Sequence, residues 1–184
     1  LTLILGPLED MLKSNSLSNK DAQKISVIHQ SAIRLLNLIN QILEFRKTET
    51  QNKKLCVSRD NIANLVYEIG FKYKELNRNP EIEFCIEVES EDMPLFYDRE
   101  VVTIILDNLI SNAIKYTPYG GKISIEASVD EHKWYLRIKD TGIGISAREQ
   151  RHIFKHIFRA DNAINSGEIG SGIGLKLVGA LVKL

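Results

Sequence analysis

The chain has 184 residues, 43% of them hydrophobic, which is enough for one ordinary domain with a core of its own and an appended segment. Its 24 basic and 24 acidic side chains cancel and form no basic block, so nothing favours a nucleic acid or an anionic membrane surface as a partner. Cys56 and Cys85 lack metal-binding spacing, which indicates free thiols that serve as small strand residues in a reducing compartment. No apolar run is long enough to span a membrane.

The first fifty residues carry a helical pattern in two parts. Leu1, Leu5, Leu8 and Leu12 form one apolar stripe, and a polar turn follows them. Ser18 then offers an N-cap, with an aspartate at the third helical position. A second helix is predicted from strict heptad spacing of the apolar residues Ile25, Ile28, Ala32, Leu35, Ile39 and Ile42.

The helices of residues 1–50 therefore form a predicted helical hairpin. Two helices with one apolar seam each cannot bury both flanks alone, so we expect half of a dimeric four-helix bundle. The alternative is that the hairpin packs on its own domain. The composition becomes polar near Gln51, where we place the boundary with a second domain of residues 51–184.

The second domain alternates strand and helix patterns. Strands are predicted at 55–57, 82–88, 122–130 and 134–140, the last two as an antiparallel hairpin. Helices are predicted at 61–76, at 98–116 with Asp98 as N-cap, and from about Ile173. The expected fold class is α+β, a sandwich with helices on one face of a mixed sheet.

The helix of residues 98–116 carries two faces. Val102, Leu106, Leu109 and Ala113 form an apolar stripe, whereas Asn108, Asn112 and Lys115 gather on a separate polar face. A solvated face usually recruits glutamate and lysine, and paired carboxamides with one ammonium suit phosphate oxygens or a hydrated cation better.

Two glycine motifs accompany this face. D-T-G-I-G-I at 140–145 follows a predicted strand, and its glycines allow close approach of backbone to a ligand. G-S-G-I-G-L at 170–175 opens a helix and offers backbone amides to an anion, although it is not the dinucleotide fingerprint. Residues 155–170 between them have no clear period, which predicts a lid over a nucleotide.

The order and spacing of these motifs resemble those of sensor histidine kinases of two-component systems. Residues 108–118 are similar to their asparagine box, 140–145 and 170–175 to their two glycine boxes, and I-F-K-H-I-F-R at 153–159 to their phenylalanine box. The hairpin resembles their dimerisation and phosphotransfer helices, so the resemblance covers the whole chain and looks most like the bacterial hybrid type. It implies the Bergerat-type ATP-binding fold shared with gyrase, Hsp90 and MutL, with further strands beyond Leu184.

The resemblance also implies a role for each matching residue. The metal ligand for Mg²⁺ would be Asn112, with Asn108 beside it, and both are expected catalytic residues together with Lys115, which would contact phosphate. Asp140 would accept the adenine amino group, because a carboxylate only accepts hydrogen bonds. The expected ATP-binding residues are Asn112, Lys115, Tyr116, Asp140, Gly142, Gly144, Phe154, Phe158, Arg159, Gly170, Gly172, Gly174 and Leu175.

The phenylalanine box departs from the usual pattern. Lys155 and His156 stand where an acidic residue and an arginine are common, which leaves Arg159 as the weaker candidate for a phosphate contact. Phe154 and Phe158 are expected to anchor the lid by burial.

Two further comparisons decide what reaction to expect. Hydrolytic relatives place a water-activating glutamate four residues before the metal-binding asparagine, and here that position is Asn108, whose amide cannot take a proton. The phosphoacceptor of these kinases lies in H-E-x-R-T-P, directly before a segment like L-T-L-I-L-G-P-L-E, and this chain opens on that segment. None of His29, His132, His152 and His156 replaces the acceptor convincingly.

The expected function is therefore an ATP-dependent protein histidine kinase core with ATP and Mg²⁺ as cofactors, which lacks its own acceptor histidine. Its expected partners are a second copy of the chain and a response regulator or fused receiver domain, with no nucleic acid and no direct membrane contact. The expected location is the cytoplasmic part of a sensor. The alternatives are an ATP-hydrolysing clamp or chaperone and a nucleotide-binding dimerisation module without catalysis.

Overall fold

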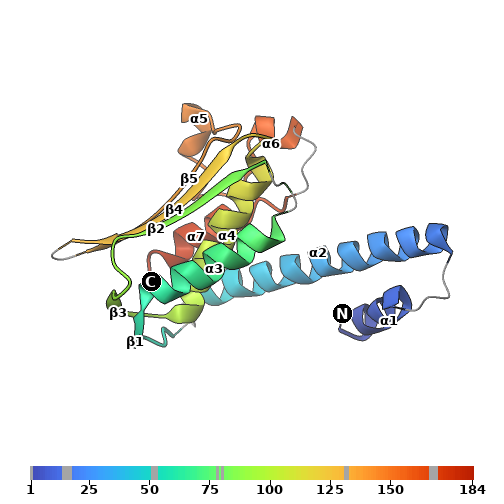
Figure 1. Cartoon of the computed structure of the whole chain (residues 1–184), viewed down its shortest axis with the longest axis horizontal. Coiled ribbons are helices and arrows are strands. Elements are labelled where there is room, and N and C mark those ends of the chain that lie inside the picture. The colour runs from blue at the N-terminus through green and yellow to red at the C-terminus, as the bar shows by residue number, and fades with distance from the viewer. Residues whose placement is uncertain are drawn as a thin grey trace. The chain divides into compact units, whose positions relative to one another are not determined.

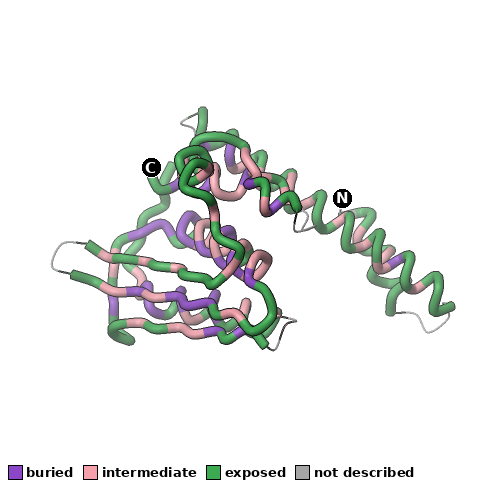
Figure 2. The backbone as a smooth tube through the Cα atoms, turned by 90° about the horizontal axis from the view of Figure 1, so that it is seen from above, coloured by how far each residue is buried: buried purple, intermediate pink, exposed green. Residues whose placement is uncertain are grey.

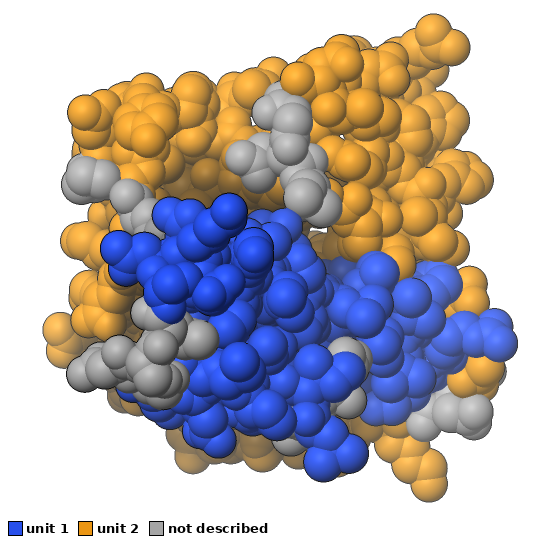
Figure 3. Space-filling view, turned by 90° about the vertical axis from the view of Figure 1, so that its right-hand side faces the viewer, with its two compact units in different colours: residues 1–47 blue, residues 48–184 orange. Residues whose placement is uncertain are grey.

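The computed structural model describes residues 2–13, 18–50, 54–77, 79, 81–130, 133–165 and 170–184. The chain divides into two compact units, residues 1–47 and residues 48–184, which Figure 3 shows in separate colours. The division lies close to the polar stretch at which the composition changes. No helix among the described residues is long and apolar enough to cross a membrane.

The first unit is helical, as predicted. Helix α1 covers Thr2–Lys13, and α2 covers Asn19–Glu49. Ser18 caps α2, because its Oγ accepts a hydrogen bond from the Asp21 amide at 3.2 Å and donates to the Asp21 carboxylate at 2.6 Å. Exposed and partly exposed residues predominate along both helices in Figure 2. Large apolar side chains of the predicted seam are among the exposed ones, namely Ile28, Leu35, Ile39 and Ile42.

Two long helices of the second unit begin after capping residues, of which Asp98 was predicted and Asn61 was not. Helix α3 covers Ile62–Leu76, and the Asn61 side chain accepts a hydrogen bond from the Ala63 amide. Helix α4 covers Arg99–Tyr116, and the buried Asp98 carboxylate accepts from the Val101 amide at 3.0 Å. The other Asp98 oxygen accepts from the Cys56 amide at 2.7 Å, so one carboxylate fixes both the helix start and the segment before strand β1 (Ser58–Asn61).

A mixed three-stranded sheet carries these helices. Its strands are β2 (Glu83–Val88), β4 (Lys122–Val129) and β5 (Trp134–Asp140), in the order β2-β4-β5. β2 is parallel to β4, and β5 is antiparallel to it, with Ile125 opposite both Ile86 and Ile138. Helices α3, α4 and α7 (Gly174–Leu181) lie on one face of this sheet (Figure 1), which confirms the α+β prediction.

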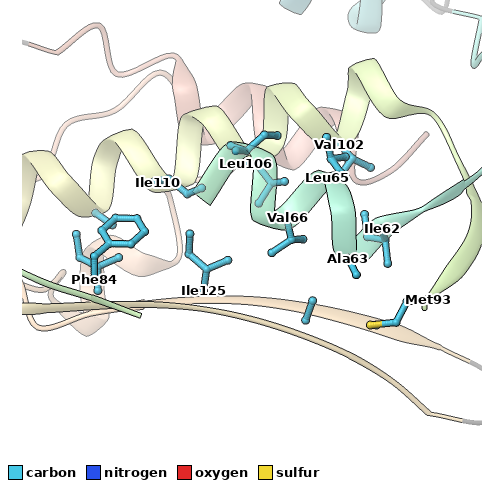
Figure 4. Close-up of a cluster of buried hydrophobic side chains, with 14 of the residues drawn as sticks. Ile62, Ala63, Leu65, Val66, Phe84, Met93, Val102, Leu106, Ile110 and Ile125 are labelled. Carbon is cyan, nitrogen blue, oxygen red and sulfur yellow. The ribbon is translucent and has the colours of Figure 1, made fainter. Parts of the chain in front are cut away.

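The core lies between this sheet and the helices. In Figure 4 the side chains of α3 and α4 point toward those of the strands, with Met93 at one end of the cluster. The largest fully buried side chains are Ile62, Leu65, Val66, Leu106, Ile110, Ile123, Ile125 and Leu177. Complete burial of one such side chain stabilises the folded state by about 1.5–3 kcal/mol. Because all of these side chains lie in the second unit, that unit has a hydrophobic core of its own.

One local prediction was wrong, and two short helices were not predicted. Residues 55–57 form no strand, and Cys56 is exposed; the polar segment Ser58–Asn61 is strand β1 instead, paired antiparallel with β3 (Pro94–Tyr97). The region predicted as an aperiodic lid contains a short helix, α6 (Asp161–Asn165), although residues 166–169 of that prediction lie outside the described residues. Helix α5 (Ala147–Gln150) was not predicted.

Candidate functional site

Asn108 lies at the contact between α4 and α7. It is only 9% exposed, and its side-chain amide donates to the Ile104 carbonyl at 2.7 Å. Its Oδ1 would lie 2.7 Å from a Cβ on Gly174, so only glycine fits at that point without displacing the asparagine. The third glycine of the 170–175 motif therefore allows α7 to begin directly against α4.

Asn112 and Lys115 continue the polar face of α4. Asn112 is partly buried, and its side chain makes no hydrogen bond within the described part of the chain. The Lys115 ammonium lies 4.8 Å from the centroid of the Tyr116 ring, which is cation–π distance. A Cβ on Gly170 would lie 2.8 Å from the same ammonium, so the start of the second glycine motif meets the end of α4.

The loop after β5 closes on the C-terminal end of α4. Asp140 is exposed at the end of β5, and its Oδ1 accepts a hydrogen bond from the Gly142 amide at 2.9 Å. The Ile143 amide donates to the Tyr116 carbonyl at 3.1 Å. A Cβ on Gly142 would lie 2.5 Å from that carbonyl oxygen, so glycine is required for this close approach.

Gly144 and Gly172 are required for the conformation of the backbone. Their φ angles are +66° and +72°, in the left-handed region that favours glycine. The carbonyl of Gly172 accepts a hydrogen bond from the Phe158 amide at 3.3 Å, which joins the 170–175 motif to the phenylalanine box. Leu175 follows in the first turn of α7 and is partly buried.

The phenylalanine box differs from its prediction in one respect. Phe158 is partly buried, but Phe154 is 47% exposed, so its expected burial is wrong. Its backbone and Cβ instead lie beside Gly179 of α7, where an added Cβ would be 3.0 Å from the Phe154 carbonyl oxygen. Arg159 donates to the Ala163 carbonyl at 3.0 Å.

Two side chains that the sequence did not point to, Asn162 and Glu149, join these segments. The Asn162 amide donates to the carbonyls of Ile143 and Gly144, at 3.2 and 2.8 Å, and so ties α6 to the loop after β5. Glu149 accepts from the Ser146 hydroxyl at 2.5 Å and from the Asp161 amide at 2.9 Å. The Ser146 hydrogen bond, followed by that from Asp161, holds the pKa of Glu149 below its usual value.

Asp107 is the neighbour of Asn108 in sequence, but its contacts are with α3. Its carboxylate lies 3.3 Å from the Lys72 ammonium of α3, and the Tyr73 hydroxyl donates to its carbonyl. Burial, chiefly, and the charge of Asp107 raise the pKa of Tyr73. Asp107 therefore stabilises the packing of α3 on α4.

The described residues contain no group of three or more histidine, cysteine, aspartate or glutamate side chains that could hold a metal ion. A hollow of about 290 Å³ lies between Glu89, Met93, Leu95 and Val129, and it includes none of the predicted site residues. The site is instead an open surface formed by the end of α4, the loop after β5 and the 170–175 motif.

Residues 97–184 match the family model of the histidine kinase-, DNA gyrase B- and HSP90-like ATPases. That range contains all the residues of the site described above. The fold and the site therefore define an ATP-binding domain of this class.

Similar proteins indicate which members of this ATPase family the chain resembles. Histidine kinase P4 of Formosa agariphila is 37% identical over this whole chain, which spans 14% of that relative. The structure of histidine kinase ThkA in complex with the response regulator protein TrrA has 28% identity and a TM-score of 0.63, covering 86% of this chain and 46% of that one. Full-length ShkA, at 23% identity and a TM-score of 0.78, matches the fold over 99% of this chain and 38% of its own.

The chain thus contains a catalytic core of the histidine kinase type, and its relatives are sensor and hybrid histidine kinases. A helical hairpin precedes this core. The chain spans only a small part of the first curated relatives it matches, 14% and 12% of their lengths.

Proposed function

We propose that this core binds Mg-ATP and transfers the γ-phosphate to a histidine outside these 184 residues, from which it passes to an aspartate of a response regulator. One observation carries the proposal: the loop after β5 closes on α4 at Tyr116, while Gly170 lies against Lys115. The loop that follows Asp140, which would bind the adenine base, and Lys115, which would bind phosphate, thus meet at the C-terminal end of α4.

We assign the base end of the nucleotide to the loop after β5. Oδ1 of Asp140 is held by the Gly142 amide, and the exposed carboxylate keeps an acceptor for the adenine amino group. Gly142 and Gly144 leave room for the base, and the Tyr116 ring provides an apolar surface for packing. The same acceptor chemistry would discriminate against guanine, whose carbonyl at that position cannot donate.

We assign the phosphate end to Asn112, Lys115 and the 170–175 motif. Asn112 suits Mg²⁺ best, because its side-chain amide oxygen is not used within the described residues and oxygen is the ligand type that Mg²⁺ prefers. Asn108 lies one turn away and holds α7 in place through Gly174. When bound, Mg²⁺ would neutralise charge on the transferring phosphate.

Transfer to a protein side chain suits the site better than rapid hydrolysis. Asn108 occupies the position of the general base in the hydrolytic relatives, and its amide donates to the Ile104 carbonyl. Asp107, the neighbouring acid, is committed to Lys72. Neither of these two residues, among those that the structure describes, is therefore placed to activate water.

The proposed partners follow from the hairpin and from the family. Apolar residues at the heptad positions of α2 stay exposed in one copy of the chain, which supports a dimer through a four-helix bundle. The solved complex of ThkA with TrrA supports a response regulator, or a fused receiver domain, as the phosphate acceptor. We expect the core to act in the cytoplasm as part of a sensor.

The test follows the γ-phosphate of labelled Mg-ATP. The 184-residue chain is mixed with a longer form of the protein that includes the upstream acceptor histidine and is inactivated by Asn112→Ala. Acid-labile, base-stable label on the longer form is the expected result. Free phosphate without labelled protein would support the hydrolase alternative, and ATP binding with neither product would support a binding module.

A further inference from the structure

Two histidines outside the proposed nucleotide site face each other on the segment between α5 and α6. The rings of His152 and His156 lie 5.8 Å apart between centroids, with 32° between their planes. Both residues are exposed, and neither ring has a hydrogen bond or an ion pair with another described residue. The kinase function proposed above uses neither side chain.

The backbone brings these rings together. The His156 amide donates to the His152 carbonyl at 3.1 Å, and the His152 amide donates to the Glu149 carbonyl at 2.8 Å. The segment thus forms a helical turn, on which residues four apart lie on the same face. Paired histidines at this spacing on a helix are a known arrangement for binding zinc.

The ring separation fits a shared metal ion. Metal–nitrogen bonds of about 2.0–2.1 Å place two imidazoles of one tetrahedral ion with centroids about 5 Å apart. The observed 5.8 Å is within reach of that distance by small side-chain rotations. Imidazole favours zinc, copper and nickel ions over magnesium, which prefers oxygen.

We propose that His152 and His156 form a binding site for a divalent transition-metal ion of the zinc, nickel or copper class, with water completing its coordination. Arg151 and Lys155 are cations in the same turn and oppose the ion, so the site is weak. Phe154 lies between the two histidines in sequence and its backbone lies beside Gly179 of α7, so a bound ion would stiffen a turn that packs on α7.

The test is calorimetric titration of the chain with zinc chloride in a buffer free of phosphate and nucleotide, with excess Mg²⁺ present. We expect saturable binding that either His152→Gln or His156→Gln weakens at least about tenfold, a change of about 1.4 kcal/mol. Matched controls are His29→Gln, which removes an imidazole near Glu9, and Cys56→Ser, which removes an exposed thiol. Neither control should change the affinity by more than about twofold.

A spacing variant separates this site from histidine content alone. The pair His156→Gln and Ile157→His keeps the number of imidazoles but turns one of them by about 100° around the helix. We expect it to lose zinc binding, while thermal unfolding without zinc stays close to that of the parent chain because both positions are exposed. Retained affinity in this variant or in the double glutamine variant, or no saturation at about 1 mM zinc, would overturn the proposal. The Asn112→Ala variant, which should disable the proposed nucleotide site, is expected to bind zinc normally. Zinc binding by this variant therefore shows whether the metal site fails separately from the nucleotide site.

Discussion

The helical unit and the ATP-binding unit of this chain bury apolar side chains to very different extents. Among the described residues of the helical unit, Ile25 and Phe45 are the buried hydrophobic ones, whereas the ATP-binding unit contains a continuous cluster from α3, α4 and the sheet. Apolar side chains that stay exposed at regular spacing indicate a surface that a partner covers. We therefore expect the ATP-binding unit to keep its fold alone and the proposed dimer to stabilise the hairpin.

Core truncation should separate the two units most strongly. Leu106→Ala removes a fully buried side chain of α4 and should lower the free energy of unfolding by about 2–5 kcal/mol. Ile28→Ala, at a side chain that is 52% exposed, should barely change unfolding of the ATP-binding unit but should weaken self-association. Urea unfolding and sedimentation equilibrium measure the two effects, and equal losses of stability would contradict the comparison.

Glycine substitution should show a similar contrast. An alanine at Gly142 would place its Cβ 2.5 Å from the Tyr116 carbonyl oxygen, which forces the loop after β5 off α4. We expect the Kd for ATP to rise at least about thirtyfold, close to 2 kcal/mol. Gly6→Ala in α1 meets no atom within 4 Å and should stabilise that helix by up to about 1 kcal/mol. Titration with a fluorescent ATP analogue checks the first expectation, and helicity checks the second.

The helix caps should differ by a smaller amount. Asp98→Ala removes acceptors for the Val101 and Cys56 amides at a buried position, and should cost about 1–2 kcal/mol of stability. Ser18→Ala removes an exposed cap from α2, so its cost should lie at the lower end of the range for such caps, about 0.5 kcal/mol. Thermal unfolding of both variants measures the difference in lost stability. Asp98→Asn, which keeps one acceptor oxygen, should cost less than Asp98→Ala.

The smallest expected effect is a pH dependence confined to the ATP-binding unit. Hydrogen bonds from Arg99, the Asn61 amide and Tyr97 lower the pKa of Asp60 below its ordinary value of 3.8. Because the folded pKa is the lower one, Asp60 stabilises the fold above that ordinary value, and its contribution is lost as the pH falls further. Asp60→Asn should lower Tm at pH 7, and its difference from the parent should shrink as the pH falls below 3.8. A Tm difference that persists unchanged in acid would contradict this account.

Much of the ATP-binding unit could be predicted because its local signals agree with its packing. Asp98 caps α4 as expected, α3 begins within one residue of its predicted start, and the predicted strands at 82–88, 122–130 and 134–140 correspond to β2, β4 and β5. The polar face of α4 likewise places Asn108 and Lys115 beside Gly174 and Gly170 of the second glycine motif, although the burial of Asn108 depends on α7 and could not be read from α4 alone.

The errors arose where partners distant in sequence decide the structure. β1 is polar, and it becomes a strand only because β3 pairs with it. Asn162 reaches Ile143 and Gly144 from another segment, so no local pattern marks it. Helix α5, in contrast, could have been predicted locally. The sequence S-A-R-E at 146–149 matches a capping box, and its serine and glutamate hydrogen-bond to each other.

The side-chain hydrogen bonds of Asn61 affect the order in which the chain folds. Its side-chain oxygen accepts from both Ala63 and Met93, and its amide donates to the Glu91 carbonyl, so the start of α3 is completed by residues about thirty positions later. Closing such a long loop costs entropy before any contact compensates it. The first turn of α3 should therefore gain hydrogen-exchange protection together with β3, and later than the middle of the same helix.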